Sequence, residues 1–230
     1  MIDVYSWPTP NGHKVHIMLE ECGFPYRVHQ VNIGNGDQFE PDFLKISPNN
    51  KIPAIVDPDG PDGQPIALFE SGAILVYLAG KAGRFLGNTD REKFVTLQWL
   101  IFQMGGVGPM LGQAHHFRIY APEQIEYAVK RYTNEAKRLY GVIDQQLSKS
   151  AYLAGDEYTI ADMATFPWLR SWKNQGIDWA DYPHAKRWFD EIDARPAVQR
   201  GVAVLADARK PLVDDKAREN LFGNTQYQKR

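Results

Sequence analysis

Strand and helix patterns alternate along the first eighty residues. Short runs rich in β-branched and aromatic residues predict strands over 2–6, 26–31, 52–56 and 66–69. Apolar residues at steps of three and four predict helices over 11–22, 40–46 and 70–81. A run of turn formers between the last two strands predicts that they form a hairpin. This order, βαβαββα, predicts a small α/β domain over residues 1–84.

After Gly87 the strand patterns stop. Thr89 and Glu92 fit a capping box, in which each side chain bonds the other residue's backbone N–H at the start of a helix. Four apolar residues follow at helical spacing, namely Phe94, Leu97, Ile101 and Met104. The glycine-rich stretch 105–109 is expected to kink or break this helix.

Further helices fill the rest of this half. A second long one is expected from Pro122, with apolar residues from Ile125 to Leu147 on one face. Thr159 and Asp162 fit another capping box, and later helices are expected from about residues 182 and 196. We therefore predict an all-helical domain over 89–206. A polar tail over 207–230 follows, with residues 221–222 as an apolar anchor.

The composition is that of an ordinary globular protein, with 43% hydrophobic and 23% charged residues. A formal net charge of -2 gives no reason to expect a nucleic-acid partner. No apolar stretch approaches the ~18 residues of a membrane span, and the first residues lack the pattern of a secretion signal. The single cysteine, Cys22, excludes an internal disulfide. We therefore expect a cytoplasmic protein without a membrane partner, whose thiol chemistry depends on an external thiol.

Three motifs resemble those of the glutathione transferase family. Residues 47–55 (SPNNKIPAI) and 68–74 (LFESGAI) resemble its glutathione-binding domain, and 153–162 (LAGDEYTIAD) resembles its helical-domain signature. The resemblance spans roughly residues 1 to 205. Residues 8–14 (PTPNGHK) and 112–117 (GQAHHF) resemble the Nu class, which is related to the fungal nitrogen-catabolite regulator. The resemblance implies a thioredoxin-like domain followed by a helical bundle, a homodimer, and glutathione-dependent disulfide reductase activity.

The resemblance also implies that Ile52, Pro53, Glu70 and Ser71 bind glutathione. Only ~5% of X-Pro bonds are cis in folded proteins, but the resemblance implies a cis Ile52–Pro53 bond that presents the Ile52 backbone to the cysteinyl residue. Ser71, at a helix start, would hold the γ-glutamyl carboxylate, and Glu70 would bind its ammonium group. The residues alone also fit an ordinary helix start with an acid and a capping serine.

The chemistry is expected in the turn before the first helix, at Thr9 and Asn11. Thioredoxin-type enzymes carry Cys-x-x-Cys there, whereas the stretch from Trp7 to Asn11 has no sulfur. A thiol with a pKa of ~8.5 is only a few per cent thiolate at neutral pH. One hydrogen bond to the anion gives ~1.5–3 kcal/mol and a helix end ~0.3–2 kcal/mol, which together suffice to lower that pKa by ~2 units. Thr9 and Asn11 are therefore the expected catalytic residues; Tyr5 and Ser6 are rival thiol donors, and a plain loop with an N-cap is the simpler alternative.

Two more contacts are carried over from the family. Gln38 matches a position that reaches the glycine end of glutathione. Arg131 matches a family position that reaches a glutathione carboxylate, either in the same subunit or across the dimer. The alternative is that Arg131 is an ordinary solvated arginine. His115 and His116 point about 100° apart on a helix without a suitably spaced carboxylate or thiol, so no metal is expected. The expected cosubstrate is glutathione, reduced or oxidised.

Three functions remain open at this point. In the first, bound glutathione thiolate attacks a small disulfide substrate. In the second, the same thiolate is conjugated to hydrophobic electrophiles held by apolar walls from Trp7, Phe117 and Tyr120. In the third, the protein is a non-enzymatic binding or regulatory module, against which the intact glutathione motifs argue.

Overall fold

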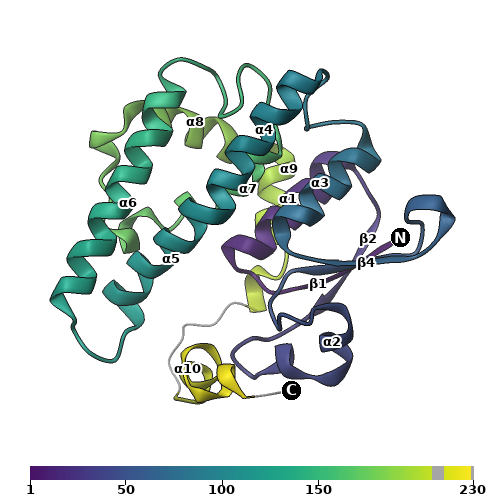
Figure 1. The fold of residues 1–230 in the computed structure, drawn as a ribbon, viewed down its shortest axis with the longest axis horizontal. Helices are drawn as coiled ribbons and strands as arrows, with labels where there is room; N and C mark the ends of the chain where they lie inside the picture. The colour runs from purple at the N-terminus through teal and green to yellow at the C-terminus, as the bar shows by residue number, and fades with distance from the viewer. Residues whose placement is uncertain (209–214, 229–230) are drawn as a thin grey trace. The chain divides into compact units, whose positions relative to one another are not determined.

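The computed structural model describes residues 1–208 and 215–228 (Figure 1). Two compact units can be separated along the chain. One contains Met1–Ile74 together with the described residues from Arg200 onward, and the other contains Leu75–Gln199. The sheet lies in the first unit and most helices lie in the second. The domain boundaries expected from the sequence, at 84–89 and 206–207, stay a prediction.

A four-stranded mixed sheet forms the centre of the first unit, in the order β2-β1-β3-β4. Its strands, in chain order, are Ile2–Ser6, Tyr26–Gln30, Ala54–Asp57 and Ile66–Phe69. β1 pairs parallel with β2 and antiparallel with β3, which pairs antiparallel with β4. A parallel pair needs a crossover connection, and α1 (Pro10–Cys22) supplies it. The predicted thioredoxin-like order of elements is therefore confirmed.

Helices cover both faces of this sheet. In Figure 1, α1 lies on one face and α2 (Pro41–Ile46) lies on the other. α3 (Ser71–Ala82) begins in the first unit and continues into the second. β1 alternates buried and half-buried residues, as expected for a strand with two covered faces. The fully buried side chains between strands and helices are mostly aliphatic, among them Val4, Ile17, Met18, Ile55 and Ile74.

The second unit is built from helices alone among its described elements. In chain order, α4 to α8 are Asp90–Phe102, Gly108–His115, Glu126–Leu147, Ile160–Leu169 and Pro183–Asp193, and α9 (Pro196–Ala203) follows. A kink or break was expected at the glycine-rich stretch, and α4 does end at Phe102, just before it. A π-helical turn, Gln103–Val107, then joins α4 to α5, so the α-helix is interrupted while the chain stays helical.

Both predicted capping boxes are present. Thr89 accepts a hydrogen bond from the Glu92 N–H at 3.3 Å, and Glu92 accepts one from the Thr89 N–H at 3.0 Å. In the second box, Asp162 is fully buried and also accepts bonds from the Leu153 N–H and the Trp188 indole, at 3.0 and 2.8 Å. Local sequence therefore determined where α4 and α7 begin.

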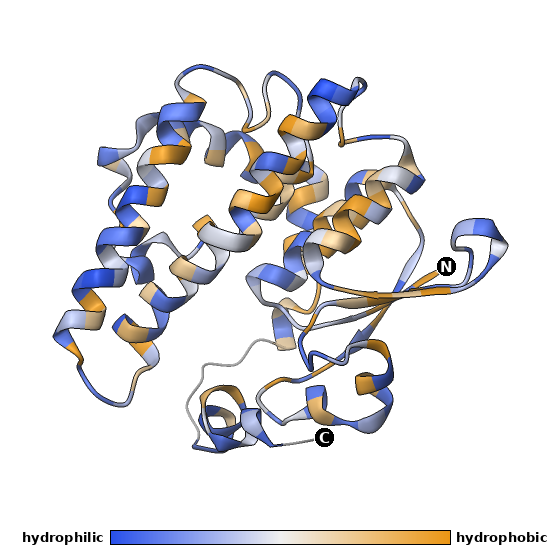
Figure 2. Ribbon diagram, viewed as in Figure 1, coloured by the Kyte–Doolittle hydropathy of each residue, from blue (hydrophilic) through white to orange (hydrophobic). Residues whose placement is uncertain are grey.

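The apolar stripe predicted on α4 is not an inward face. Phe94 and Ile101 are 71% and 66% exposed. α6 matches its prediction better, since Ala136, Leu139 and Ile143 are fully buried or nearly so, and Figure 2 shows polar and apolar residues alternating along it. Its first expected member, Ile125, is 45% exposed and is the N-cap residue, since the helix begins at Glu126.

The continuous helical segment Asp90–Tyr120 is long enough and apolar enough to cross a membrane, with a mean hydropathy of 1.2 over its most apolar window. The sequence analysis missed this segment, because polar residues interrupt its apolar ones. One such helix is weak evidence for a membrane span, since the core helix of a soluble protein passes the same test.

The described part of the C-terminal tail is structured in the first unit. Its helix, α10 (Asp215–Phe222), buries Ala217 and Asn220, whereas the expected anchor Phe222 is 40% exposed. The Asn220 side chain donates to the Gly34 carbonyl at 2.8 Å. Lys51 Nζ also donates to Gln226 Oε1 at 2.6 Å. These two polar contacts hold the described part of the tail against the first unit. The pattern of apolar residues along the sequence did not predict them.

Candidate functional site

The expected site residues of the first unit gather at one end of the sheet. Thr9 and Asn11 follow the C-terminal end of β1, and Glu70 follows that of β4. Pro53 directly precedes β3, whose first residue, Ala54, pairs with both Tyr5 of β1 and Phe69 of β4. Gln38 follows β2, which is parallel to β1. The topology therefore brings together sequence-distant segments that no local pattern could relate.

Thr9 is the N-cap of α1. Its extended backbone turns the chain into the helix, and its hydroxyl oxygen accepts a hydrogen bond from the Gly12 N–H at 3.2 Å. A hydroxyl that accepts in this way still carries a hydrogen that it can donate. The N-cap interpretation and the thiol-donor interpretation of Thr9 are therefore compatible. Asn11 lies in the first turn of the same helix and is half-buried.

Gly12 sets how closely this turn approaches the helix. A Cβ atom at this position would lie 2.2 Å from the Trp7 carbonyl oxygen and 2.7 Å from Ser6 Oγ. Because the first of these is a backbone atom, no side-chain rotation could relieve the clash. Gly12 therefore allows the turn that carries Thr9 to fold back against α1.

The two rival thiol donors, Ser6 and Tyr5, make contacts of their own. Ser6 is fully buried, and its hydroxyl donates to the neighbouring Trp7 carbonyl at 3.5 Å. The Tyr5 ring stacks on His29 with ring centroids 4.6 Å apart, and it also packs near Phe43. The assignment of the thiol contact to Thr9 and Asn11 stays a prediction.

The Ile52–Pro53 peptide bond is cis, as the resemblance implied. The Ile52 side chain packs against a small buried cluster of Val31, Phe43 and Ala54. This packing fixes the side chain on the protein side, so that the backbone of Ile52 is the part left to meet a ligand.

Glu70 and Ser71 form the junction between β4 and α3. Glu70 has a φ of 70°, in the left-handed region that costs a non-glycine residue of order 1–3 kcal/mol. Its carbonyl accepts the first helical hydrogen bond, from the Ile74 N–H at 3.0 Å, so Glu70 takes the capping position and Ser71 is the first helical residue. The Glu70 carboxylate is exposed and accepts a bond from the Asn49 amide at 3.4 Å. An exposed anion beside a helix N-terminus suits a ligand that carries both charges.

Lys14 is a residue of this site that the sequence analysis missed. Its Nζ lies 3.4 Å from Ser71 Oγ, and the whole residue is 1% exposed. Burial lowers the pKa of Lys14 to about 7, against a smaller opposing effect of the Glu70 carboxylate. The signal was present in the sequence, because Lys14 lies three and four residues before Ile17 and Met18 and so shares their buried face.

Gln38 is 2% exposed, and its amide nitrogen donates to the Ile33 carbonyl at 3.3 Å. Its Oε1 is buried without a hydrogen-bond partner among the described residues. A buried acceptor without a donor costs about 1–3 kcal/mol. A ligand N–H at this position would remove that cost, which fits the expected contact with the glycine end of glutathione.

Comparisons with known proteins agree with this geometry. Residues 9–81 match the family described as "Glutathione S-transferase, N-terminal domain", and residues 107–196 match "Glutathione S-transferase, C-terminal domain". The chain belongs to the glutathione S-transferase family. The family expected from the motifs is therefore confirmed, together with its fold.

Individual relatives in the glutathione S-transferase family are similar over most of their length. Disulfide-bond oxidoreductase YfcG of Escherichia coli is 53% identical over 91% of this chain and 99% of the relative. A transferase family member from Pseudomonas fluorescens, solved with two glutathione molecules, is 51% identical with a TM-score of 0.83, over 87% of this chain and 92% of that one. A Pseudomonas putida transferase, solved with one glutathione disulfide per subunit, is 46% identical with a TM-score of 0.84, over 88% and 91%.

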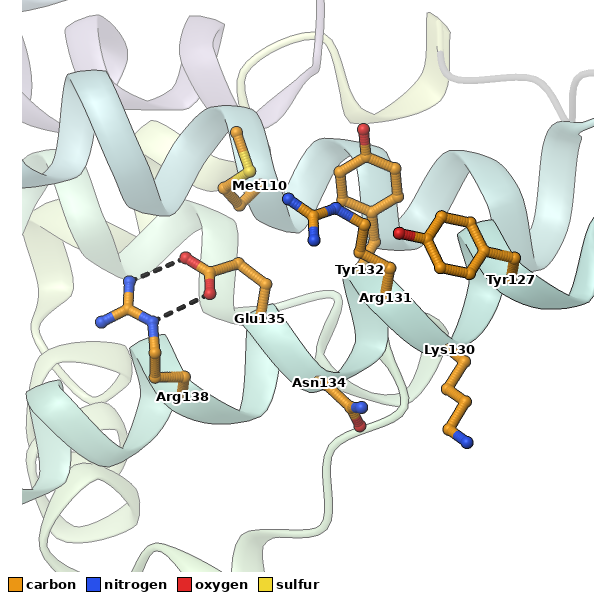
Figure 3. A pocket seen from close by; sticks show the side chains of 8 residues that line it. All are labelled: Met110, Tyr127, Lys130, Arg131, Tyr132, Asn134, Glu135 and Arg138. Atoms are coloured by element: carbon orange, nitrogen blue, oxygen red, sulfur yellow. Dashed lines mark hydrogen bonds and ion pairs between the residues drawn. The ribbon is translucent and has the colours of Figure 1, made fainter.

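Arg131 lies on α6, in the second unit. It lines a hollow of about 680 Å³ between α5 and α6, and Figure 3 shows its guanidinium between Met110 and Tyr132. Arg138, in the same hollow, is paired with Glu135 at 2.7 Å. Lys130 and Arg131 add two further positive charges, so the hollow suits an anionic group.

The adjacent histidines make side-chain contacts of their own. His115 stacks on Tyr120 with centroids 4.9 Å apart, and its Nε2 lies 3.2 Å from the Asn174 amide nitrogen. His116 packs edge-on against Phe117. Within residues 1–208 and 215–228, no group of three or more His, Cys, Asp or Glu side chains could hold a metal ion.

Proposed function

We propose that this protein is a glutathione-dependent disulfide-bond reductase. The observation that carries the proposal is its 53% identity, over nearly the full length of both chains, to a protein named a disulfide-bond oxidoreductase. The site supports it, because the turn from Trp7 to Asn11 lacks sulfur and the only cysteine, Cys22, lies at the far end of α1. The reacting thiol then belongs to glutathione.

The residues of the site fit glutathione along its length. Glu70 and the N-terminus of α3 at Ser71 offer opposite charges to the γ-glutamyl zwitterion. The Ile52 backbone suits the cysteinyl residue, and the buried Gln38 acceptor suits an N–H at the glycine end. Thr9 and Asn11 at the start of α1 would then stabilise the thiolate with hydrogen bonds and the helix dipole.

The reaction needs two glutathione molecules, the number bound in the Pseudomonas fluorescens relative. The bound thiolate attacks one sulfur of the substrate disulfide, which forms a mixed disulfide and releases one substrate thiolate. A second glutathione thiolate attacks the mixed disulfide. This step releases the second substrate thiol and forms glutathione disulfide, so the two electrons come from glutathione.

A comparison of two substrates tests the proposal. Reduced glutathione with a small dialkyl disulfide should turn over readily, with thiol release followed by a coupled assay for glutathione disulfide. Conjugation of glutathione to an aryl halide should be slow. The opposite ranking would make the protein a conjugating transferase, and failure to bind glutathione in calorimetry would favour a non-enzymatic module.

The proposal includes a homodimer in the cytoplasm. The exposed Phe94 and Ile101 of α4 support self-association, since large apolar side chains on one helix face favour a protein partner. The single cysteine and the need for reduced glutathione support the cytoplasm. Light scattering tests the dimer: Phe94→Glu should lower the molar mass toward that of one chain, and a monomeric wild type would refute it.

A further inference from the structure

The C-terminal tail, described over residues 215–228, is bonded to two segments of the first unit. Asn220 of α10 is buried, and its amide nitrogen donates to the Gly34 carbonyl at 2.8 Å. In Figure 1, α10 lies beside the chain that leads from β2 to α2. Gln226 Oε1 accepts a hydrogen bond from Lys51 Nζ at 2.6 Å. The tail therefore joins two segments that are separate in the sequence.

Both segments lead to residues that are expected to bind glutathione. Gly34 lies four residues before Gln38, and Lys51 directly precedes Ile52. The Gln38 amide nitrogen donates to the Ile33 carbonyl at 3.3 Å. Because Ile33 and Gly34 are successive residues, the Gln38 side chain and the tail bond neighbouring peptide groups. A shift at the tail contact is therefore transmitted to Gln38.

The loop fits closely against the tail. Gly36 has a φ of 96°, in the left-handed region that favours glycine. A Cβ atom at Gly36 would lie 3.3 Å from Asn220 Nδ2. Within the loop, Asp37 accepts a hydrogen bond from the Asn32 N–H at 2.9 Å. The loop is therefore constrained both by its own hydrogen bonds and by the tail.

The tail is itself held in a compact turn. Glu219 Oε1 accepts hydrogen bonds from the N–H and the hydroxyl of Thr225, at 3.0 and 3.2 Å. The Gln226 amide nitrogen donates to the Asn220 carbonyl. Since Gln226 also bonds Lys51, the backbone of Asn220 is linked to a second segment of the unit. Asn220 can therefore act as a fixed support for the loop.

Gln38 is the site residue that needs such a support. It is 2% exposed, and its Oε1 is buried without a hydrogen-bond partner among the described residues. A hydrogen bond weakens steeply when the donor and the acceptor are misaligned. A ligand N–H can therefore satisfy this buried acceptor only while the loop keeps Gln38 in place.

We propose that Asn220 is a positioning residue that holds Gln38, through the Gly34 carbonyl, for the glycyl N–H of glutathione. The inference rests on the proposed function and deepens it, because it assigns selectivity for the third residue of glutathione to the C-terminal tail. γ-Glutamylcysteine, which lacks glycine, has a carboxylate in place of this N–H. It cannot donate to Gln38 Oε1, and its oxygen atoms would face that acceptor.

Calorimetry with two S-methylated ligands tests the proposal. S-methylglutathione and S-methyl-γ-glutamylcysteine share two residues and have no thiol to ionise. The wild type should bind the tripeptide at least ~10-fold more tightly, because the dipeptide leaves a buried acceptor without a donor. Asn220→Ala should lower this preference by ~3–10-fold, the effect of about one hydrogen bond, by weakening the tripeptide and leaving the dipeptide unchanged.

Three results would overturn the proposal. They are a wild type without the preference, an Asn220→Ala variant that keeps the wild-type preference, and a variant that binds both ligands more weakly by the same factor. The measured quantity is a ratio of two affinities for the same protein. A general loss of stability therefore does not imitate the expected result.

Three further variants assign the effect. Gln38→Ala should lose the preference, and adding Asn220→Ala to it should lower the preference no further, because both residues act on one contact. Asn220→Asp keeps the shape of the side chain and replaces its donating amide with an acceptor, so it should lower the preference at least as far as Asn220→Ala. Asn224→Ala, the same change at an exposed position of the tail, should keep the wild-type preference.

The outcomes separate this inference from the proposed function. If S-methylglutathione does not bind to the wild type, the proposed function fails as well. If it binds with the expected preference and Asn220→Ala keeps that preference, only the role of Asn220 fails. Additive losses in the double variant would also refute a shared contact, since independent sites add and coupled sites do not.

Discussion

Thr9 serves two roles that substitution can separate. Its hydroxyl oxygen caps α1 by accepting a hydrogen bond from the Gly12 N–H at 3.2 Å. Its hydroxyl hydrogen can donate a hydrogen bond to a glutathione thiolate. Thr9→Ala removes both. Loss of the cap should cost ~1 kcal/mol of stability. Loss of a hydrogen bond to the anion, ~1.5–3 kcal/mol, should raise the pKa of the bound thiol by ~1–2 units.

Two companion variants assign the effect. Thr9→Ser keeps the hydroxyl and should retain both stability and activity. Thr9→Asp keeps the cap, because aspartate is as good an N-cap as serine, but its charge opposes a neighbouring thiolate. Thr9→Asp should therefore be as stable as the wild type and less active than Thr9→Ala.

The assay follows ultraviolet absorbance of the bound thiolate against pH, together with disulfide reductase turnover. Below the thiol pKa of the wild-type complex, Thr9→Ala should show ~10–100-fold less thiolate and correspondingly slower turnover. Chemical unfolding measures the cap separately. If Thr9→Ala loses only the stability of a cap while its bound thiol titrates as in the wild type, Thr9 is a structural residue and the reasoning fails.

Three further predictions concern buried polar groups and the tail. Asp162→Asn should destabilise the protein by about 2–4 kcal/mol in urea unfolding, because each oxygen of Asp162 accepts from two donors and an amide NH₂ in place of either oxygen would face two of them; the exposed Asp156→Asn should stay within ~0.5 kcal/mol. Because burial lowers the pKa of Lys14 to about 7, the unfolded chain holds the extra proton between pH 7 and 10. Stability of the ligand-free protein should therefore rise with pH there, by up to roughly 1.4 kcal/mol per unit, and Lys14→Met should remove that slope in unfolding experiments at several pH values. Removal of residues 207–230 should lower the melting temperature through loss of the Asn220–Gly34 and Lys51–Gln226 hydrogen bonds, each worth ~1 kcal/mol. An unchanged melting temperature would show that these two contacts of the tail do not stabilise the first unit.

Local signals in the sequence predicted most elements to within a few residues. Capping residues did so best, because a cap involves atoms only three residues apart, as at Thr89 and Thr159. The kink or break expected near residues 105–109 takes the form of a π-helical turn between α4 and α5, and the chain stays helical through the glycines. Where a helix continues depends on packing, and the pattern of one segment does not contain that information.

Burial was harder to predict than secondary structure. Phe94 and Ile101 follow helical spacing as core residues do, yet both are exposed on α4. Conversely, Lys14 was passed over because lysine is usually exposed, although its position on α1 put it on the buried face. Periodicity shows which residues share a face, but the surrounding elements decide which face is covered.

The sequence by itself determined the family, the order of the strands and helices, and the segments that carry the site, since these depend on short motifs and local geometry. The tertiary structure decided how these segments meet. Sheet pairing brings the ends of β1, β3 and β4 together, and the packing of α1 places Lys14 beneath Ser71, 57 positions away along the chain. The titration of that lysine near neutral pH follows from desolvation, a property of the folded surroundings that no stretch of sequence carries alone.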